Sequence, residues 1–361
     1  MRRGDIKDFQ GLRSGQRSDC GGRAGTLPYR EGSLHKNSKQ GGQSMQTTRT
    51  ITANGIDMFL REQGSGPLVI LCHGWPELSF SWRHQIPALA NAGYRVVAPD
   101  MRGFGQTTSP DDATASTIFD TVGDMVALVA ALGETQAVII GHDWGAPVAW
   151  HAAMFRPDVF TAVAGLSVPP PLRGRGRPLE TLRKDGISNF YWQYFQEPGV
   201  AEAEFERDVD FTMRAMFSGG FSSPLRSLFV EHGHGFLGDP AIERPLPDWI
   251  SEADLAQFVA TYKASGFRGG MNWYRNIDRN WELTAPWQGA RIHQPSLFIA
   301  GSEDSVITGL IGKKRVGDME RVVSNLKGKI ILDGAGHWIQ QERPAQVNAA
   351  LIAFLKDNGP Q

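Results

Sequence analysis

The sequence has few cysteines, almost no net charge and no long hydrophobic run, and each absence excludes a class of protein. Its 361 residues include only two cysteines, Cys20 and Cys72, too few for a disulfide-built fold and without the spacing of a metal site. The net charge of −1 gives no basic surface for nucleic acid. Apolar runs stay far below the ~18 residues of a membrane span. We therefore expect a reduced, cytoplasmic globular protein with no nucleic-acid partner, membrane span, metal or cofactor.

Residues 1–44 differ in composition from the rest of the chain. They are rich in Gly, Ser, Arg and Lys and show no sustained apolar period, so we expect them to be disordered. They lack the apolar core of a secretory signal, and acidic residues interrupt the basic pattern of a transit segment. Met45 is a candidate for the natural start of the chain.

From Met45 onward, continuous apolar runs alternate with helical stretches. Runs such as PLVILCHG, AVIIGHD and PSLFIAGSED are typical of parallel strands buried on both faces. This alternation predicts an α/β fold with a mostly parallel, doubly wound sheet. Residues 170–286 break the alternation and are rich in aromatics and helix formers. We expect them to form a helical cap over the carboxyl ends of the strands, with residues 45–169 and 287–361 as the core.

A strand, a turn and a helix are predicted around Asp143. The segment GHDWG at 141–145 fits the G-x-nucleophile-x-G elbow of a large hydrolase fold, in which a serine usually stands at the centre. That fold supplies its triad in the order nucleophile, acid, base. Asp304 and its rival Glu303 follow one later strand, and His337 follows the next in a glycine-flanked loop. The predicted triad is therefore Asp143, one of these two carboxylates, and His337.

The segment CHGWPE at 72–77 is expected to provide half of an oxyanion hole. A turn after the third strand of this fold places backbone N–H groups beside the nucleophile. We assign the hole to the N–H groups of Trp75 and Trp144. His73 is expected to support the loop, because its place in the chain does not fit the base. Pro76 is expected to have an unusual peptide geometry, and the sequence leaves open whether its peptide bond is cis.

Three polar side chains near these motifs are expected to be structural. Asp100 and Arg102, in PDMRGFGQT, are expected to form ion pairs. His142 flanks the nucleophile, and packing is its default explanation.

Five segments together resemble the soluble epoxide hydrolases of the α/β-hydrolase fold: HGWPE, GHDWGAPVAW, NFYWQYFQEPG, SGFRGGMNWYRN and GAGHWIQQERP. The resemblance covers the chain from Met45 onward. It implies that two cap tyrosines, Tyr191 and Tyr274, hydrogen-bond the epoxide oxygen and stabilise the developing alkoxide. Tyr194 competes for the first position, and the family's spacing before FQEPG favours Tyr191. The resemblance also implies a detoxifying hydrolase that acts on a small-molecule epoxide.

A carboxylate nucleophile suits attack on an oxirane carbon. A serine would leave an ether that water does not readily cleave, whereas Asp143 would leave an ester that water can hydrolyse. An aspartate is already ionised at neutral pH and needs no base for this first step. His337 is then reserved for ester hydrolysis, oriented by Asp304, which the resemblance favours over Glu303. The expected product is a vicinal diol.

Other functions remain open at this point. A haloalkane or haloacid dehalogenase would use the same aspartate, and the indoles of Trp144 and Trp75 could bind its halide. A non-enzymatic receptor of this fold would have a degraded triad, and an esterase would normally use Ser or Cys. The sequence is compatible with a monomer or a homodimer.

Overall fold

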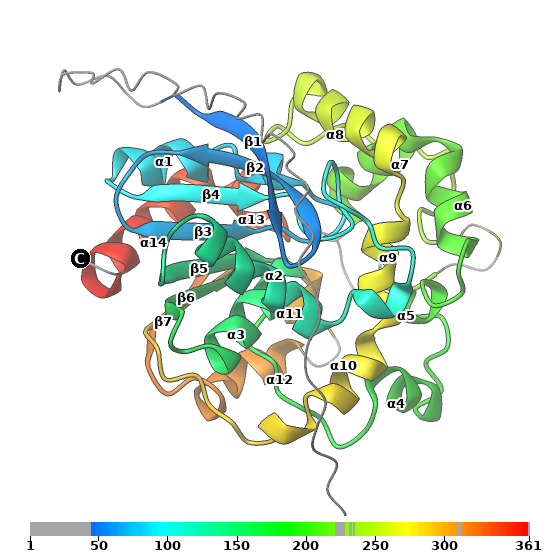
Figure 1. Cartoon of the computed structure of the whole chain (residues 1–361). Coiled ribbons are helices and arrows are strands. Elements are labelled where there is room, and N and C mark those ends of the chain that lie inside the picture. Colours follow the sequence, from blue (N-terminus) through cyan, green and yellow to red (C-terminus); the bar gives the residue numbers. More distant parts are fainter. Residues whose placement is uncertain (1–44, 221–227, 231–232, 234, 310–311, 360–361) are drawn as a thin grey trace, which may run out of the picture. The chain divides into compact units, whose positions relative to one another are not determined.

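The computed structural model describes residues 45–220, 228–230, 233, 235–309 and 312–359. The disorder predicted for residues 1–44 lies outside these described residues. An eight-stranded sheet runs in the order β1-β2-β4-β3-β5-β6-β7-β8 (Figure 1). The strands are β1 (Thr47–Ala53), β2 (Ile56–Gln63), β3 (Leu68–Cys72), β4 (Arg95–Pro99), β5 (Ala137–His142), β6 (Phe160–Leu166), β7 (Ser296–Gly301) and β8 (Leu326–Leu332).

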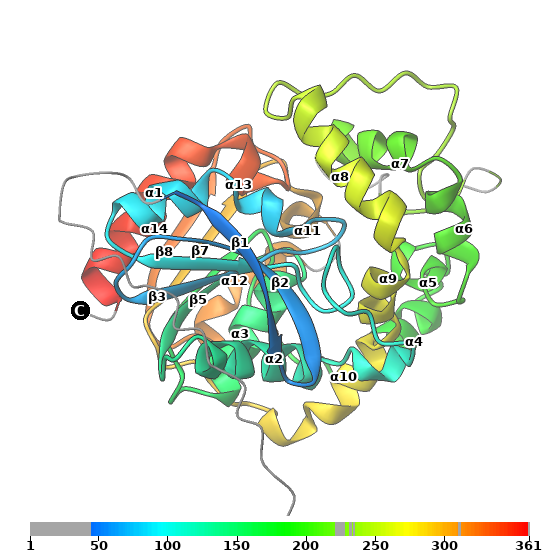
Figure 2. The same cartoon turned by 45° about the horizontal axis from the view of Figure 1, so that its top comes forward.

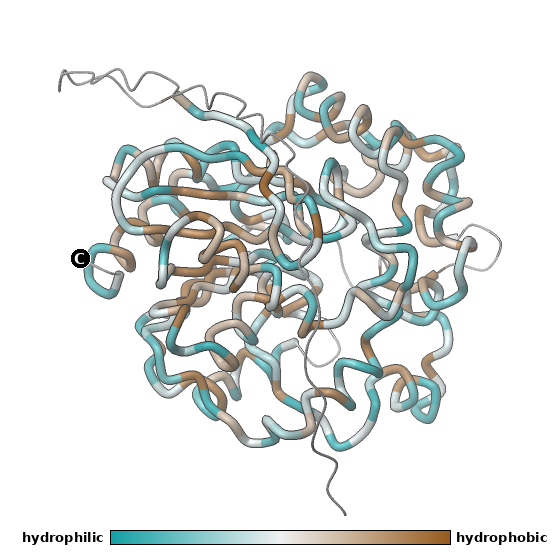
Figure 3. The backbone as a smooth tube through the Cα atoms, viewed as in Figure 1, coloured by the Kyte–Doolittle hydropathy of each residue, from teal (hydrophilic) through white to brown (hydrophobic). Residues whose placement is uncertain are grey.

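The sheet is parallel from β4 to β8, and only β2 pairs antiparallel, with β1 and with β4. β3 and β5 are buried at every residue, which explains their continuous apolar sequences. Side chains alternate between the two faces of β3. Ile70 and Cys72 join one apolar cluster, and Val69 and Leu71 join another. Figure 3 shows these inner strands as largely hydrophobic. The predicted doubly wound α/β fold is confirmed.

Helices of the core cover both faces of this sheet. Residues of α2 and α3 belong to the cluster of Ile70, and residues of α1 and α14 belong to that of Val69. α2 begins with a capping box between Thr117 and Asp120, which satisfies free N–H groups of its first turn. The core helices are α1 (Gln85–Asn91), α2 (Ile118–Ala131), α3 (Gly145–Phe155), α11 (Ser305–Thr308), α12 (Gly312–Gly317), α13 (Ile339–Glu342) and α14 (Pro344–Asn358).

The predicted helical insertion lies between β6 and β7. Figures 1 and 2 show α5 to α9 together at one side of the sheet. The boundaries at 170 and 286 remain predictions. The helices of the insertion are α4 (Pro178–Lys184), α5 (Tyr191–Tyr194), α6 (Val200–Arg207), α7 (Val209–Ala215), a π-helical turn (Met216–Gly220), α8 (Glu252–Ser265), α9 (Arg268–Arg275) and α10 (Ile277–Leu283).

Helix α9 contacts the loop that follows β4. The Trp273 indole N–H donates to the Arg102 carbonyl at 3.0 Å. The backbones of Gly103 and Gly269 approach so closely that a Cβ on either would overlap the other. Glycine at both positions therefore lets the cap reach the carboxyl end of the sheet. None of the helices within the described residues is long and apolar enough to cross a membrane.

Candidate active site

Asp143 occupies a strained turn between β5 and α3. Its φ is +48°, a left-handed conformation that is uncommon for a residue with a side chain. A Cβ at Gly141 would overlap the backbone of Gly145, and one at Gly145 would overlap the Cys72 carbonyl. The two flanking glycines therefore permit the sharp elbow that presents Asp143. Such strain persists only where surrounding structure enforces it.

The Trp75 N–H donates to Asp143 Oδ1 at 2.8 Å. The Trp75–Pro76 peptide bond is cis, which settles the geometry that the sequence left open. Glycine is required at 74, because a Cβ there would overlap the Asp143 carboxylate. Trp144 is the N-cap of α3, so its N–H lies where a helix has no internal acceptors. The two N–H groups assigned to the oxyanion hole thus come from the loop after β3, which contacts the Asp143 carboxylate, and from the residue that follows Asp143.

His337 lies between two carboxylates. Its Nε2 is 3.4 Å from Asp143 Oδ2, and its Nδ1 is 3.1 Å from each Asp304 carboxylate oxygen. Both His337 and Asp304 are fully buried. Burial disfavours the charged ring, but the carboxylates of Asp304 and Asp143 outweigh it and raise the pKa of His337 well above its ordinary value. The three members of the predicted triad are therefore in contact.

Tyr191 and Tyr274 lie together on the cap side of Asp143. Their ring centroids are 5.7 Å apart at 71°, and their hydroxyl groups share a hydrogen bond. The Tyr274 ring packs edge-on against the Trp144 ring at 5.1 Å. Burial, and then the charge of Asp143 among other groups, raises the pKa of both phenols far above the ordinary range. Both side chains therefore keep their O–H protons at neutral pH.

The chain is similar to known epoxide hydrolases over most of its length. The family described as alpha/beta hydrolase fold matches residues 67–344. The chain is 44% identical over 316 residues to Epoxide hydrolase A of Mycobacterium tuberculosis, covering 86% of this chain and 97% of that protein. It is 40% identical over 310 residues to Epoxide hydrolase 2 of Siraitia grosvenorii, covering 85% and 97%. The crystal structure of Epoxide Hydrolase A from Mycobacterium thermoresistibile aligns with a TM-score of 0.82 at 45% identity, covering 88% and 100%.

This chain belongs to the epoxide hydrolases of the α/β-hydrolase fold. In this hydrolase, the surroundings differ between the two candidates for the orienting acid and between the two candidates for the first cap tyrosine. Glu303 is exposed, whereas Asp304 is buried against His337. The Tyr194 hydroxyl donates to Glu204 at 2.7 Å, whereas Tyr191 faces Tyr274. The geometry thus favours Asp304 and Tyr191 over their rivals.

His73 of the hydrolase holds two loops together. The Met101 N–H donates to its Nε2 at 2.9 Å, so the ring proton is on Nδ1, which lies 2.8 Å from the Gly74 carbonyl oxygen. Burial lowers the pKa of His73, in keeping with this neutral form. The ring therefore connects the loops that follow β3 and β4, as expected of a supporting residue.

The pairing expected for Asp100 and Arg102 is partly wrong. The Arg102 guanidinium forms a buried ion pair with Asp124. The Asp100 carboxylate instead accepts hydrogen bonds from the Ser79 N–H at 2.9 Å and the Ser79 hydroxyl at 2.7 Å. Sequence spacing identified the loop but not which partners the fold brings to it.

A buried pair beneath the elbow escaped the sequence analysis. Glu77 Oε2 lies 2.6 Å from His142 Nδ1, and His142 Nε2 lies 2.8 Å from the His337 carbonyl oxygen. Glu77 also accepts from the Gly74 N–H at 3.0 Å and the Gln340 amide at 2.7 Å. Packing alone therefore does not account for His142. The sequence feature that could have indicated this network is the glutamate of HGWPE, a charged residue directly after the motif's proline.

Glu77→Gln is expected to lower the free energy of unfolding at pH 7 by about 3 kcal/mol. Burial opposes the charge of Glu77, but His142 and the other donors outweigh it and lower its pKa from 4.5 to about 2. A depressed carboxyl pKa contributes stability that is present above pH 4.5 and lost as the pH falls toward 2. Denaturant titrations across this window should show a weaker acid loss in the variant.

The exposed Glu303 offers a matched control for that measurement, and Glu303→Gln should leave the free energy of unfolding unchanged. An acid-induced loss in Glu77→Gln as steep as in the parent would contradict the assigned role of Glu77.

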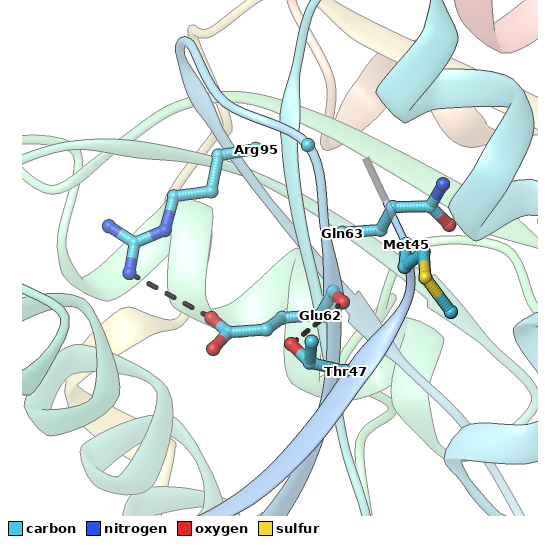
Figure 4. Close-up of a pocket in the computed structure, with 6 residues that line it drawn as sticks. Met45, Thr47, Glu62, Gln63 and Arg95 are labelled. Atoms are coloured by element: carbon cyan, nitrogen blue, oxygen red, sulfur yellow. Dashed lines mark hydrogen bonds and ion pairs between the residues drawn. The ribbon is translucent and has the colours of Figure 1, made fainter. Parts of the chain in front are cut away.

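A surface pocket at the outer strands of this hydrolase is separate from the triad. It has a volume of about 280 Å³. Figure 4 shows the Glu62 carboxylate 3.8 Å from the Arg95 guanidinium and the Thr47 hydroxyl donating to the Glu62 carbonyl oxygen at 3.5 Å. β3 lies between β4 and β5 in the sheet, so the pocket does not adjoin the elbow. Its lining residues are Met45, Thr47, Glu62, Gln63, Gly64 and Arg95.

No three His, Cys, Asp or Glu side chains form a group that could hold a metal ion within the part of the chain that the structure describes.

Proposed function

We propose that this epoxide hydrolase opens its substrate by forming a covalent ester on Asp143 and then hydrolysing it to a vicinal diol. One observation carries the proposal: a carboxylate stands at the nucleophile elbow and contacts the Trp75 N–H through Oδ1 and His337 through Oδ2. A carboxylate there can attack saturated carbon and leave an ester that water can cleave. The substrate is a small-molecule epoxide, and the residues of the site require no cofactor.

In the first step, Asp143 Oδ2 attacks one ring carbon and the bond from that carbon to the ring oxygen breaks. Oδ1 keeps its hydrogen bond from the Trp75 N–H and becomes the ester carbonyl oxygen. Tyr191 and Tyr274 donate to the ring oxygen and stabilise the alkoxide as it forms. Their raised pKa values support this role, because both hydroxyls remain protonated donors.

In the second step, His337 accepts a proton from water as the water attacks the Asp143 ester carbonyl. In the free protein, the negative charge of Asp143 helps to raise the pKa of His337. Ester formation removes this charge. Alkylation of Asp143 therefore lowers the pKa of His337 and favours the neutral ring, which can accept a proton from water in this step. Asp304 orients the ring, and the N–H groups of Trp75 and Trp144 stabilise the tetrahedral oxyanion. Collapse of this intermediate breaks the bond from the Asp143 carbonyl carbon to the product oxygen, which takes the proton from His337. The second proton of the water neutralises the alkoxide left by ring opening, so the diol departs and the Asp143 carboxylate is restored.

The leaving group separates this proposal from the dehalogenase alternative. A halide would be held by indole N–H groups, but the Trp144 side chain hydrogen-bonds the Tyr274 hydroxyl. The Trp75 indole N–H has no hydrogen-bond partner among the described residues and is free to contact a halide. Halide release is therefore measured alongside diol formation. The paired phenols favour an oxygen leaving group, which must be stabilised and protonated.

Incubation with aryl, alkyl and lipid epoxides is expected to yield vicinal diols, and incubation with an alkyl chloride is expected to release no chloride. Diol is measured by mass spectrometry and chloride by ion chromatography. Asp143→Asn is the matched control and should form neither product. Chloride release at a rate similar to diol formation would contradict the assignment of an oxygen leaving group.

We also propose a cytoplasmic location, supported by the buried free thiol of Cys72. Both a monomer and a homodimer are compatible with the proposed chemistry, since each residue of the mechanism comes from one chain.

A further inference from the structure

The two tyrosines of the site lie on short helices whose carbonyl groups need outside donors. α5 has four residues, and α9 has eight. The last four carbonyl groups of a helix have no partner within it. The carbonyls of Trp192 and Tyr274 both belong to this class. Whatever donates to them helps to set where Tyr191 and Tyr274 lie.

One side chain donates to both carbonyls. Gln196 Nε2 lies 2.7 Å from the Trp192 carbonyl oxygen and 3.1 Å from the Tyr274 carbonyl oxygen. A glutamine amide nitrogen carries two protons, one for each acceptor. Gln196 lies two residues after the end of α5, and its amide contacts α9 at a residue 78 positions further along the sequence. It therefore links the two tyrosine-bearing helices beside the tyrosines themselves.

We propose that Gln196 is a positioning residue that sets the separation of the Tyr191 and Tyr274 hydroxyls for attack on the epoxide. The inference rests on the donor role proposed above for the two tyrosines. Two donors act together on one oxygen only if both hydroxyls reach it at hydrogen-bond distance. The ring separation of 5.7 Å depends on the relative position of α5 and α9. A displacement of ~1 Å at a reacting centre can cost about 100-fold in rate.

Other contacts hold the same helices in the cap, so replacing Gln196 should shift the tyrosines without unfolding the protein. Arg275, next to Tyr274, forms an ion pair with Glu202 at 2.7 Å, and both side chains are largely buried. The Phe195 ring, next to Gln196, packs edge-on against the Tyr274 ring at 4.8 Å. These residues hold the interface between the helices together, and the Gln196 amide adds two hydrogen bonds that fix the relative position of α5 and α9.

The variants Gln196→Met and Gln196→Glu test the inference in single-turnover experiments with styrene oxide. Met keeps the length of the side chain without N–H groups, and Glu places a carboxylate against two carbonyl oxygens. The rate of alkylation, followed by tryptophan fluorescence, should fall by ~10-fold for Met and about 100-fold for Glu. The rate of ester hydrolysis should stay within about twofold of the parent, because that step uses His337 and not the tyrosines.

Gln193 supplies a matched control on the same segment. Its amide donates to the Leu179 carbonyl at 2.8 Å and accepts from Arg183 at 3.0 Å, which links α5 to α4 and not to α9. Gln193→Met should therefore leave the alkylation rate unchanged. An equal loss in Gln193→Met and Gln196→Met, or an equal loss of both chemical steps in Gln196→Met, would reduce Gln196 to a general structural residue and overturn the inference.

The same assay separates failure of the inference from failure of the proposed function. If Tyr274→Phe alkylates at the parental rate, the tyrosine role itself is wrong. If Tyr274→Phe slows alkylation and Gln196→Met does not, only the inference is wrong. The expected result is that the Gln196→Met effect disappears in a protein that also carries Tyr191→Phe and Tyr274→Phe, since coupled residues are not additive. A Gln196→Met effect that persists there would also overturn the inference.

Discussion

His337→Gln is expected to form the ester on Asp143 and then stop. The first step needs only the ionised carboxylate and the two phenols, none of which this substitution removes. The second step needs a base 3.4 Å from Asp143 Oδ2, and a glutamine amide cannot accept the proton. Turnover should fall by about 10⁴-fold, comparable with the loss of a triad member in other hydrolases.

The prediction is tested by detecting the ester that accumulates on Asp143. Intact-protein mass spectrometry should show an increase equal to one epoxide molecule, and peptide mapping should place it on Asp143. His151→Gln is a suitable control, because this histidine on α3 hydrogen-bonds the Pro147 carbonyl oxygen at 2.7 Å and has no part in the mechanism. Rapid epoxide consumption by His337→Gln without any added mass would contradict the two-step scheme.

Removal of both phenol hydroxyls is expected to stop the reaction at the earlier step. Tyr191→Phe or Tyr274→Phe should slow alkylation by about 10²-fold each, and the double variant by about 10⁴-fold, within the range of general acid catalysis. Both rings remain in place as phenylalanines, so the apolar packing is kept. Stopped-flow fluorescence under single-turnover conditions measures this rate directly.

Tyr194→Phe is the matched control for the tyrosine pair. Its hydroxyl is bonded to Glu204 at 2.7 Å, so its loss should leave the alkylation rate close to that of the parent. The pH profile adds a second check. Because burial raises the pKa of both donor phenols, alkylation should not decline near the ordinary phenol pKa of about 10. A large loss in Tyr194→Phe with none in Tyr191→Phe would reverse the assignment.

The parts of the site that the sequence predicted are those in which neighbours along the chain determine the geometry. GHDWG predicts the elbow because glycines at 141 and 145 leave room that a Cβ would fill. The burial of every residue of β3 and β5 follows from their continuous apolar runs. His337 and the adjacent carboxylates Glu303 and Asp304 could be placed because they follow strands of one parallel sheet, whose carboxyl ends lie at a common edge. The choice of Asp304 over Glu303 came from the family resemblance.

The contacts that the sequence did not predict join residues far apart in the chain. Glu77 and His142 are 65 residues apart and meet because β3 and β5 are neighbours in the sheet. Gln196 and Tyr274 meet only through the packing of the cap. Arg102 pairs with Asp124 of α2, a partner that no local spacing marks. Hydrophobic periodicity indicates which face of an element is buried, but not which polar groups of two elements face each other.

Isotope labelling during one turnover tests the covalent ester most directly. Excess enzyme is mixed with an epoxide in H₂¹⁸O, and the diol and the Asp143 peptide are analysed by mass spectrometry. Water that attacks the ester carbonyl leaves its oxygen on the carboxylate, while the original Asp143 oxygen departs with the product. The account predicts ¹⁸O in Asp143 and an unlabelled diol. A labelled diol with unlabelled Asp143 would show direct attack of water on the ring and would contradict it.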